Sequence, residues 1–158
     1  PDESFDFVCC MDVLYMLDET SRPLAVKEFI RVLKPGGRLL VHNAALEGLR
    51  SPHDEVVMTQ KRFTQRDHDA LFHDPRLQKL KSSYRVTLLF PFVAGVKLVK
   101  RLAHQVFPRM NMQATDQGVP AMPINAVLSA VMYLENALNR ILRFPFGSSV
   151  YYLGEKVK

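Results

Sequence analysis

One short stretch of the chain gathers polar side chains of the kinds that bind small molecules or move their protons: Ser51, His53, Asp54 and Arg62. His53 beside Asp54 offers a base with a neighbouring carboxylate, an arrangement suited to general acid–base catalysis. Packing in a core would require apolar residues here, so the polarity of the stretch predicts a pocket in a surface loop. A lid held together by its own polar contacts is the alternative that the sequence leaves open.

Two further groups of candidate residues come directly after short apolar runs that are typical of buried strands. Asp12 and Leu14 follow the first run, and His42 and Asn43 end the second. Ligands of open α/β sheets bind beyond the carboxyl ends of the parallel strands, so both groups are expected at one edge. His42 and Asn43 could there orient a substrate or accept its proton. The structural alternatives are that Asp12 caps a turn and that His42 joins a local hydrogen-bond network.

A strand–helix–strand unit over residues 1–43 is expected to position these groups. Residues 4–11 form a continuous apolar run that predicts a strand buried on both faces. Between 26 and 33, apolar side chains recur at i, i+3, i+4 and i+7, which predicts one apolar stripe on a helix. The Lys-Pro-Gly-Gly segment at 34–37 should end that helix. Residues 38–43 then form a second buried strand, parallel to the first.

The rest of the chain divides into two parts. Residues 44–76 are expected to form a loop, which carries the polar candidates, and a short helix that Thr64 caps. Residues 77–158 should add terminal strands over 80–88 and 149–153. The first of these alternates with period two and presents one basic, solvated face.

A helical insertion is expected between the two terminal strands. Apolar side chains predict helices over residues 92–106 and 123–141, with a loop over 108–123. The second helix carries an apolar stripe with polar residues opposite. The stripe consists of Val127, Val131, Leu134, Leu138 and Ile141.

The 158 residues carry a formal net charge of +5, which is unevenly distributed. Residues 1–60 are net acidic and residues 61–158 are net basic, which suits an anionic ligand or a membrane surface near the second part. A solvated surface explains the same distribution. Lys97, Lys100 and Arg101 would suit weak contact with a membrane surface. The basic residues are too scattered to form a nucleic-acid-binding arm.

No membrane anchor or secretory leader is expected, because the longest weakly polar stretch, 88–96, is far too short to span a bilayer. The adjacent Cys9 and Cys10 should point to opposite faces of a strand, so we interpret them as buried, unbridged cysteines of a cytoplasmic protein. Asp69 and His73 have a helical spacing that could hold a metal ion. Two ligands without a third favour a solvated helix face, so no metal site is predicted.

Several short segments carry a family resemblance: Phe5–Val8, Asp12–Leu14, Arg31–Gly37, Leu39–Val41, Ser51–Asp54, Arg62–Thr64 and Phe144–Ser149. The first four resemble, in order, parts of the class I S-adenosylmethionine-dependent methyltransferases. They are similar to the fourth strand of that family, the helix after it, an L-K-P-G-G turn and the fifth strand. The last three are similar to a subgroup of the family that acts on small molecules.

The resemblance implies an α/β fold, with the second half of a doubly wound, Rossmann-like methyltransferase sheet and an added helical cap. The family binds its cofactor through a glycine-rich turn, and the only glycine pair here, Gly36-Gly37, follows a helix. The chain therefore resembles a partial domain without the cofactor-cradling half. By itself it should bind S-adenosylmethionine negligibly, and the open edge of its first strand predicts self-association.

By resemblance, the longer protein transfers a methyl group from S-adenosylmethionine to a small-molecule acceptor. Met11, Asp12 and Leu14 would then bind the cofactor; His42, His53 and Asp54 would act in catalysis; and Asn43, Ser51, Arg62 and Phe63 would bind the acceptor. The alternative is a non-catalytic fragment or degenerate methyltransferase-like domain that binds a partner or a membrane surface.

Overall fold

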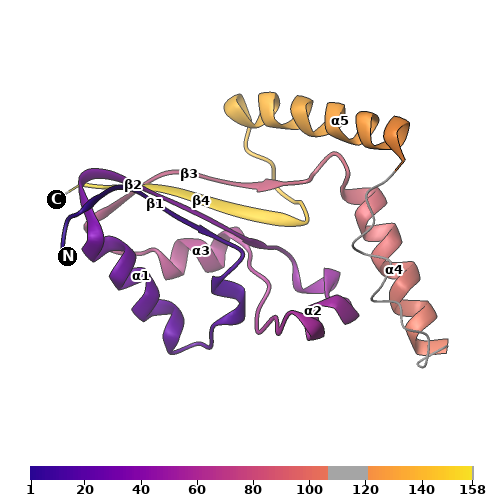
Figure 1. Ribbon diagram of the computed structural model, residues 1–158, viewed down its shortest axis with the longest axis horizontal. Coiled ribbons are helices and arrows are strands. Elements are labelled where there is room, and N and C mark those ends of the chain that lie inside the picture. Colours follow the sequence, from indigo (N-terminus) through magenta and orange to yellow (C-terminus); the bar gives the residue numbers. More distant parts are fainter. Residues whose placement is uncertain (107–120, 158) are drawn as a thin grey trace.

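A four-stranded sheet forms the centre of the protein (Figure 1). The structure is a computed structural model that describes residues 1–106 and 121–157. The strands are β1 (Phe5–Met11), β2 (Leu33–Ala44), β3 (Leu77–Arg85) and β4 (Ser149–Lys156), in the order β1-β2-β4-β3. β1 runs parallel to β2, and β4 is antiparallel to both of its neighbours. This arrangement confirms the predicted α/β, Rossmann-like sheet.

Helices lie on both sides of the sheet (Figure 1). On one side are α1 (Ser21–Val32) and α3 (Gln65–Leu71); on the other is α5 (Met122–Ile141), while α4 (Phe90–Val106) extends beyond the end of the sheet. The short elements are the 3-10 turns η1 (Leu14–Met16) and η2 (Glu47–Leu49) and the helix α2 (Pro52–Val56). Among residues 1–106 and 121–157, no helix combines the length and apolarity needed to cross a membrane.

The core lies between the sheet and the layer of α1 and α3. Successive side chains of a strand point to opposite faces, and every second residue is buried in β4 and, from Gly37 onward, in β2. The buried strand residues on this face include Leu39, Val41 and Tyr152. They belong to one cluster with Val26 and Ile30, which lie on the apolar stripe of α1. The apolar residues predicted to share one side of a helix between 26 and 33 therefore form the face of α1 that closes the core.

The Lys-Pro-Gly-Gly segment lies inside β2 and not in a turn before it. The helix ends at Val32 and β2 begins at Leu33, earlier than expected. Phe5 pairs with Leu33 and Phe7 with Arg38, so the intervening residues of β2 form a bulge. Gly36 adopts a φ of 78° there, a conformation that glycine takes without steric cost. The prediction that the helix ends at this segment is thus confirmed, although α1 ends one residue earlier than expected, at Val32, and the segment belongs to the bulge.

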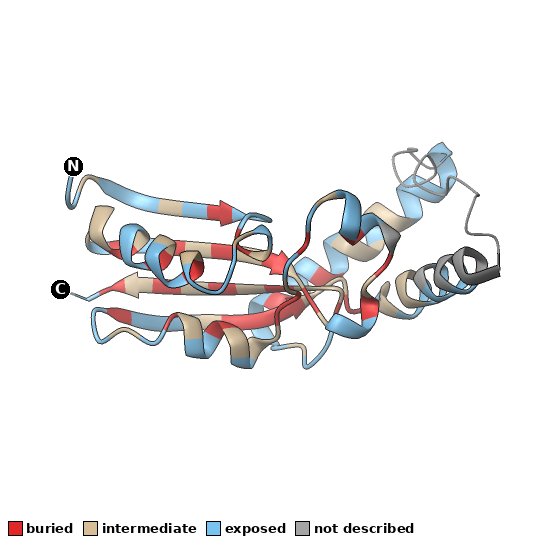
Figure 2. Ribbon diagram, turned by 90° about the horizontal axis from the view of Figure 1, so that it is seen from below, coloured by how far each residue is buried: buried red, intermediate tan, exposed pale blue. Residues whose placement is uncertain are grey.

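β1 is an edge strand, and the prediction that both of its faces are buried is wrong. Phe5 and Phe7 are 51% and 52% exposed, and Cys10 is its one buried residue. Figure 2 shows this strand at the margin of the sheet, mostly in the colour of exposed residues. Cys9 is exposed and unbridged, so only Cys10 is a buried cysteine. Among the described residues, β2 is its only neighbour in the sheet, and no strand pairs with its other edge.

The helical insertion and the strand before it depart from the sequence pattern in two ways. β3 spans 77–85 instead of 80–88, with an irregularity between Lys79 and Lys81 that leaves Leu80 exposed. α5 contacts the sheet through a polar side, so that Glu135 and Asn139 are buried. Three residues of its predicted apolar stripe are exposed, Val127, Leu134 and Ile141, and the other two, Val131 and Leu138, are half-buried. The predicted loop over 108–123 falls largely on residues 107–120, and like the side chains of Lys97, Lys100 and Arg101 these lie outside the described residues.

A buried histidine on α3 joins that helix to the sheet. The side chain of His68 is fully buried, and its ring centroid lies 5.2 Å from that of Phe63 and 5.6 Å from that of Phe72. The amide of Asn43 on β2 contacts its Nε2 atom at 3.0 Å. Burial disfavours the charged imidazolium and lowers the pKa of His68 to about 4, although the neighbouring Asp67 and Asp69 act in the opposite direction.

We predict that His68 makes the protein less stable as the pH falls from about 6.5 to about 4. In this range the unfolded chain binds a proton on His68 that the folded chain does not, because the folded pKa is lowered from 6.5 to about 4. The loss should reach about 3 kcal/mol at the lower end. Urea unfolding between pH 7.5 and 4 should show a steep slope that His68→Gln reduces and that His73→Gln, an exposed control, retains. An unchanged slope in His68→Gln would contradict this assignment.

We also predict that the isolated chain self-associates through β1. An exposed strand edge with apolar side chains is a template for pairing with another strand. Sedimentation velocity should show a concentration-dependent dimer or larger species. Phe7→Lys should shift the chain towards monomer, whereas Leu24→Lys, which changes an exposed apolar residue of α1, should not. A monomer at all concentrations would refute the prediction.

Candidate functional site

A histidine–aspartate pair lies where β1 and β2 end. The backbone N–H of Asp12 donates to the carbonyl of His42 at 2.9 Å, which continues the ladder one residue beyond β1. Asp12 then takes a φ of 55°, a left-handed conformation that aspartate tolerates better than most residues. Its Oδ1 atom lies 3.2 Å from Nδ1 of His42. The carboxylate thereby orients the imidazole, and the other ring nitrogen remains available as a base.

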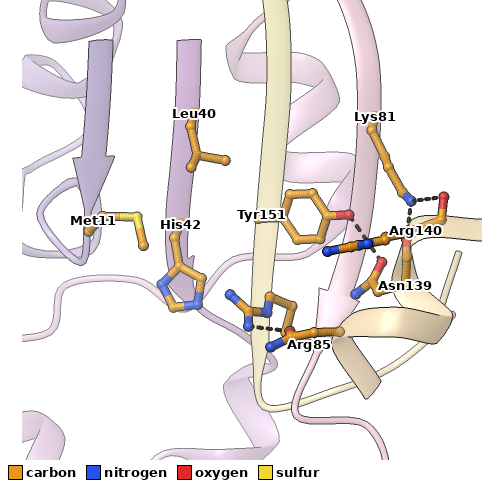
Figure 3. A pocket seen from close by; sticks show the side chains of 9 residues that line it. Met11, Leu40, His42, Lys81, Arg85, Asn139, Arg140 and Tyr151 are labelled. Atoms are coloured by element: carbon orange, nitrogen blue, oxygen red, sulfur yellow. Dashed lines mark hydrogen bonds between the residues drawn. The ribbon is translucent and has the colours of Figure 1, made fainter. Parts of the chain in front are cut away.

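His42 lines a pocket of about 520 Å³ between the sheet and α5 (Figure 3). Side chains from four strands and one helix converge on it, some of them more than a hundred residues apart in the sequence. The lining residues are Met11, Leu40, His42, Lys81, Arg85, Asn136, Asn139, Arg140 and Tyr151. The sheet thus forms its floor and α5 forms one wall.

Polar contacts hold α5 in place over this face. The buried carboxylate of Glu135 accepts hydrogen bonds from the backbone N–H of Val86 at 2.5 Å and of Leu88 at 2.8 Å. The Asn139 amide donates to the carbonyl of Tyr84 at 3.1 Å. These bonds satisfy the polar groups that docking removes from water, a condition that buried polar groups must meet to be stable.

One basic side chain, Lys81, and one phenolic side chain, Tyr151, complete the wall of the pocket. Lys81 donates to the carbonyls of Asn139 and Arg140 near the end of α5, where a cation complements the helix dipole. The hydroxyl of Tyr151 donates to Oδ1 of Asn139 at 3.0 Å. Burial raises the pKa of Tyr151, opposed in part by Arg85 and Arg143. The phenol is therefore a neutral donor at physiological pH.

The polar loop residues form a separate buried network. Arg62 donates from Nε to Oδ1 of Asp54 at 2.9 Å and from Nη1 to the carbonyl of Ala45 at 2.9 Å. Ser51 donates to Oδ2 of the same aspartate through its N–H at 2.8 Å and its hydroxyl at 3.0 Å. The side chains of Arg62 and Asp54 are only 5% and 3% exposed. This geometry corresponds to the self-bonded lid, whereas His53 lies exposed on α2.

Three other predicted site residues are part of the core. Leu14, Asn43 and Phe63 are buried to within 1% of full burial. Asn43 and His42 are neighbours in β2, so alternation sends them to opposite faces and only His42 reaches the pocket. The structure therefore divides the expected cofactor group as well: Met11 and Asp12 are exposed at the end of β1, whereas Leu14 belongs to the buried core cluster.

The structure also brings in residues that sequence reasoning did not select. Lys81, Arg85, Arg140 and Tyr151 come from the second half of the chain, and the sequence pattern predicts a solvated strand face for the first two. The sequence shows that Lys81 and Arg85 lie on one face of a strand, but it does not show that α5 covers this face and leaves both side chains half-buried. Asp69 pairs with Lys79 at 2.9 Å, and the described residues contain no cluster of three potential metal ligands.

Comparison with known sequences finds a similarity in the first part of the chain. Residues 1–41 match the sequence model of the methyltransferase domain family. An uncharacterized protein of Haemophilus influenzae is 32% identical over 97 residues, which cover 57% of this chain and 39% of that protein.

Solved structures resemble the whole chain. Phosphoethanolamine N-methyltransferase 2 from Haemonchus contortus, bound to S-adenosylmethionine, matches 100% of this chain and 34% of its own with a TM-score of 0.53 at 15% identity. Geranyl diphosphate C-methyltransferase from Streptomyces coelicolor matches 99% of this chain and 48% of its own, with a TM-score of 0.52 at 13% identity.

A putative sarcosine dimethylglycine methyltransferase from Galdieria sulphuraria is a third example, with a TM-score of 0.50 at 16% identity over 98% of this chain and 54% of its own. The chain thus spans about half the length of these proteins, or less. At such identities the likeness establishes the fold alone. Residues 1–41 match the sequence model of the methyltransferase domain family, and the chain has a Rossmann-like α/β fold similar to that of these S-adenosylmethionine-dependent methyltransferases.

Proposed function

We propose that the protein carrying this chain transfers a methyl group from S-adenosylmethionine to a small-molecule acceptor. The observation that supports the proposal most directly is the Asp12–His42 pair beside the pocket. The pair lies at the carboxyl ends of two parallel strands, the end at which open α/β sheets bind ligands. In this proposal the chain supplies the acceptor side of the site.

Only part of a cofactor site is formed by these residues. Met11 and Asp12 are accessible at the sheet edge and could border the methionine portion of the cofactor, in keeping with the resemblance. Gly36-Gly37 lies in the bulge at the start of β2, at the opposite end of that strand. We therefore assign the cofactor cradle to parts of the protein outside this chain, and expect the chain alone to bind S-adenosylmethionine negligibly.

The chemistry asked of this chain is positioning and proton removal. The bound cofactor would supply a methyl group that its sulfonium already activates. Asp12 accepts a hydrogen bond from Nδ1–H of His42, which leaves Nε2 to take a proton from the acceptor's nucleophile. The pocket walls hold the acceptor and limit the water around it, and such alignment accounts for a large part of catalysis in two-substrate reactions.

A second function is favoured by a specific observation. Three residues of the apolar stripe of α5 are exposed: Val127 at 63%, Leu134 at 55% and Ile141 at 86%. Such a surface suits a non-catalytic domain that binds a partner or a membrane surface. In that case methyl transfer would be absent and the Asp12–His42 pair would be structural.

The free Cys9 and Cys10 support a cytoplasmic location in either case.

We predict that His42→Ala lowers the rate of methyl transfer by about 100-fold, the usual contribution of a general base. The measurement is transfer of labelled methyl from S-adenosylmethionine in the full-length protein. Asp12→Asn should reduce the rate less, because the imidazole keeps its place but loses its carboxylate. His73→Ala changes an exposed histidine away from the pocket and serves as the control. Equal activity of His42→Ala and the control would rule out the proposed base.

The loop variants separate acceptor binding from stability. If the loop binds the acceptor, His53→Ala should lower kcat/KM for the acceptor about tenfold, or 1.4 kcal/mol, without changing the free energy of unfolding. Arg62→Ala should in addition destabilise the fold by about 3–5 kcal/mol, because it leaves Asp54 buried without its main cation. Lys79→Ala breaks a half-exposed pair and should cost less than about 1 kcal/mol. Unchanged acceptor kinetics in both loop variants would make the loop a structural lid.

A further inference from the structure

The pocket beside His42 is positively charged. Three cationic side chains line it, Lys81 and Arg85 from β3 and Arg140 from α5, and none of its lining residues is acidic. Figure 3 shows the side chains of Arg85 and Arg140 between β4 and α5, facing the same space as Tyr151. A concave site lined by charges of one sign concentrates ions of the opposite sign.

These cations are held by neutral groups. Arg85 donates from Nη2 to Oδ1 of Asn136 at 2.6 Å, and Lys81 donates to backbone carbonyls. Within residues 1–106 and 121–157, no ion pair with a carboxylate is found for Lys81, Arg85 or Arg140. The carboxylate of Glu135 accepts two backbone N–H groups and does not line the pocket. The positive charge of the pocket is therefore left for a ligand.

A second pocket shows that this pattern is not general. It lies around the ends of β3 and β4 and includes Asp69, Asp74 and Lys79 in its lining. Lys79 is paired there with Asp69 at 2.9 Å. Mixed and mutually compensated charges of this kind do not select an anion.

We propose that the pocket beside His42 binds the phosphate or carboxylate group of a small molecule, chiefly through Arg85 and Arg140. Guanidinium groups suit both anions because they offer parallel N–H donors to two oxygens. Lys81 is already committed to the end of α5, so its part is to add charge and hold the wall. If the proposed function is correct, this group belongs to the acceptor, and Met11 and Leu40 cover its apolar portion next to His42.

Binding of simple anions tests the proposal without any methyl transfer. Isothermal titration of the full-length protein with pyrophosphate, inorganic phosphate and acetate should show saturable binding that weakens as NaCl is raised. The double variant Arg85→Gln/Arg140→Gln should weaken it at least tenfold. Arg140→Gln alone changes an exposed side chain that makes no hydrogen bond or ion pair with the other described residues, and it should weaken binding at least threefold even if the double variant fails to fold. Arg66→Gln, an exposed arginine on α3, is the matched control and should bind like the wild type.

Lipid headgroups carry the same chemistry, so a second arm uses vesicles with and without anionic phosphatidic acid. Binding to free anions alone assigns the site to a soluble small molecule. Binding to anionic vesicles that pyrophosphate displaces, and that Arg140→Gln weakens, assigns it to a lipid headgroup. Absence of saturable binding, or equal weakening by Arg66→Gln and Arg140→Gln, would overturn the proposal. Loss of methyl transfer with intact anion binding would refute the proposed function and leave this site standing.

Discussion

The alternation of side chains along β2 is the constraint on which the site and the core both depend. β2 pairs with β1 on one side and with β4 on the other, so its register is set twice. Leu39, Val41 and Asn43 face α1 and α3, while Leu40 and His42 face the pocket. A shift by one residue would exchange these two sets and bury His42 in the core. Burial of Leu39, Val41 and Asn43 on one face of the sheet thus places the imidazole of His42 on the other face.

The second face of the sheet is organised by polar contacts instead of apolar ones. α5 is held by Glu135 and Asn139, whose buried groups find backbone partners on and after β3. Polar groups are costly to bury unless every donor and acceptor is matched. Such contacts therefore specify one position of the helix more narrowly than an apolar surface would. The consequence is a pocket lined by polar side chains of α5 and an apolar stripe on that helix of which Val127, Leu134 and Ile141 are exposed.

Two carboxylates near the site have different parts because their surroundings differ. Asp12 is half-exposed and contacts one imidazole nitrogen, so it can tune a proton acceptor without holding the fold together. Asp54 is buried and bound by Ser51 and Arg62, a desolvated arrangement in which each partner requires the other. The loop that begins at Ser51 is consequently stabilised by its own buried polar contacts. The accessible reactive side chain of the site is His42, at the end of β2.

The sequence by itself determined the local units and their order: the strand–helix–strand start, the parallel pairing of β1 and β2, the arrival of His42 at the sheet edge, and the family resemblance. Each of these follows from hydropathy over a few neighbouring residues, or from motifs within one segment. The choice of partners was decided only by the tertiary structure. His42 contacts Asp12, 30 residues away, and the carboxylate of Asp54 pairs with Arg62, eight residues away, instead of the adjacent His53. Likewise, periodicity selects the apolar side of α5, yet long-range hydrogen bonds to β3 bury the polar side, because packing energy depends on groups that local pattern does not contain.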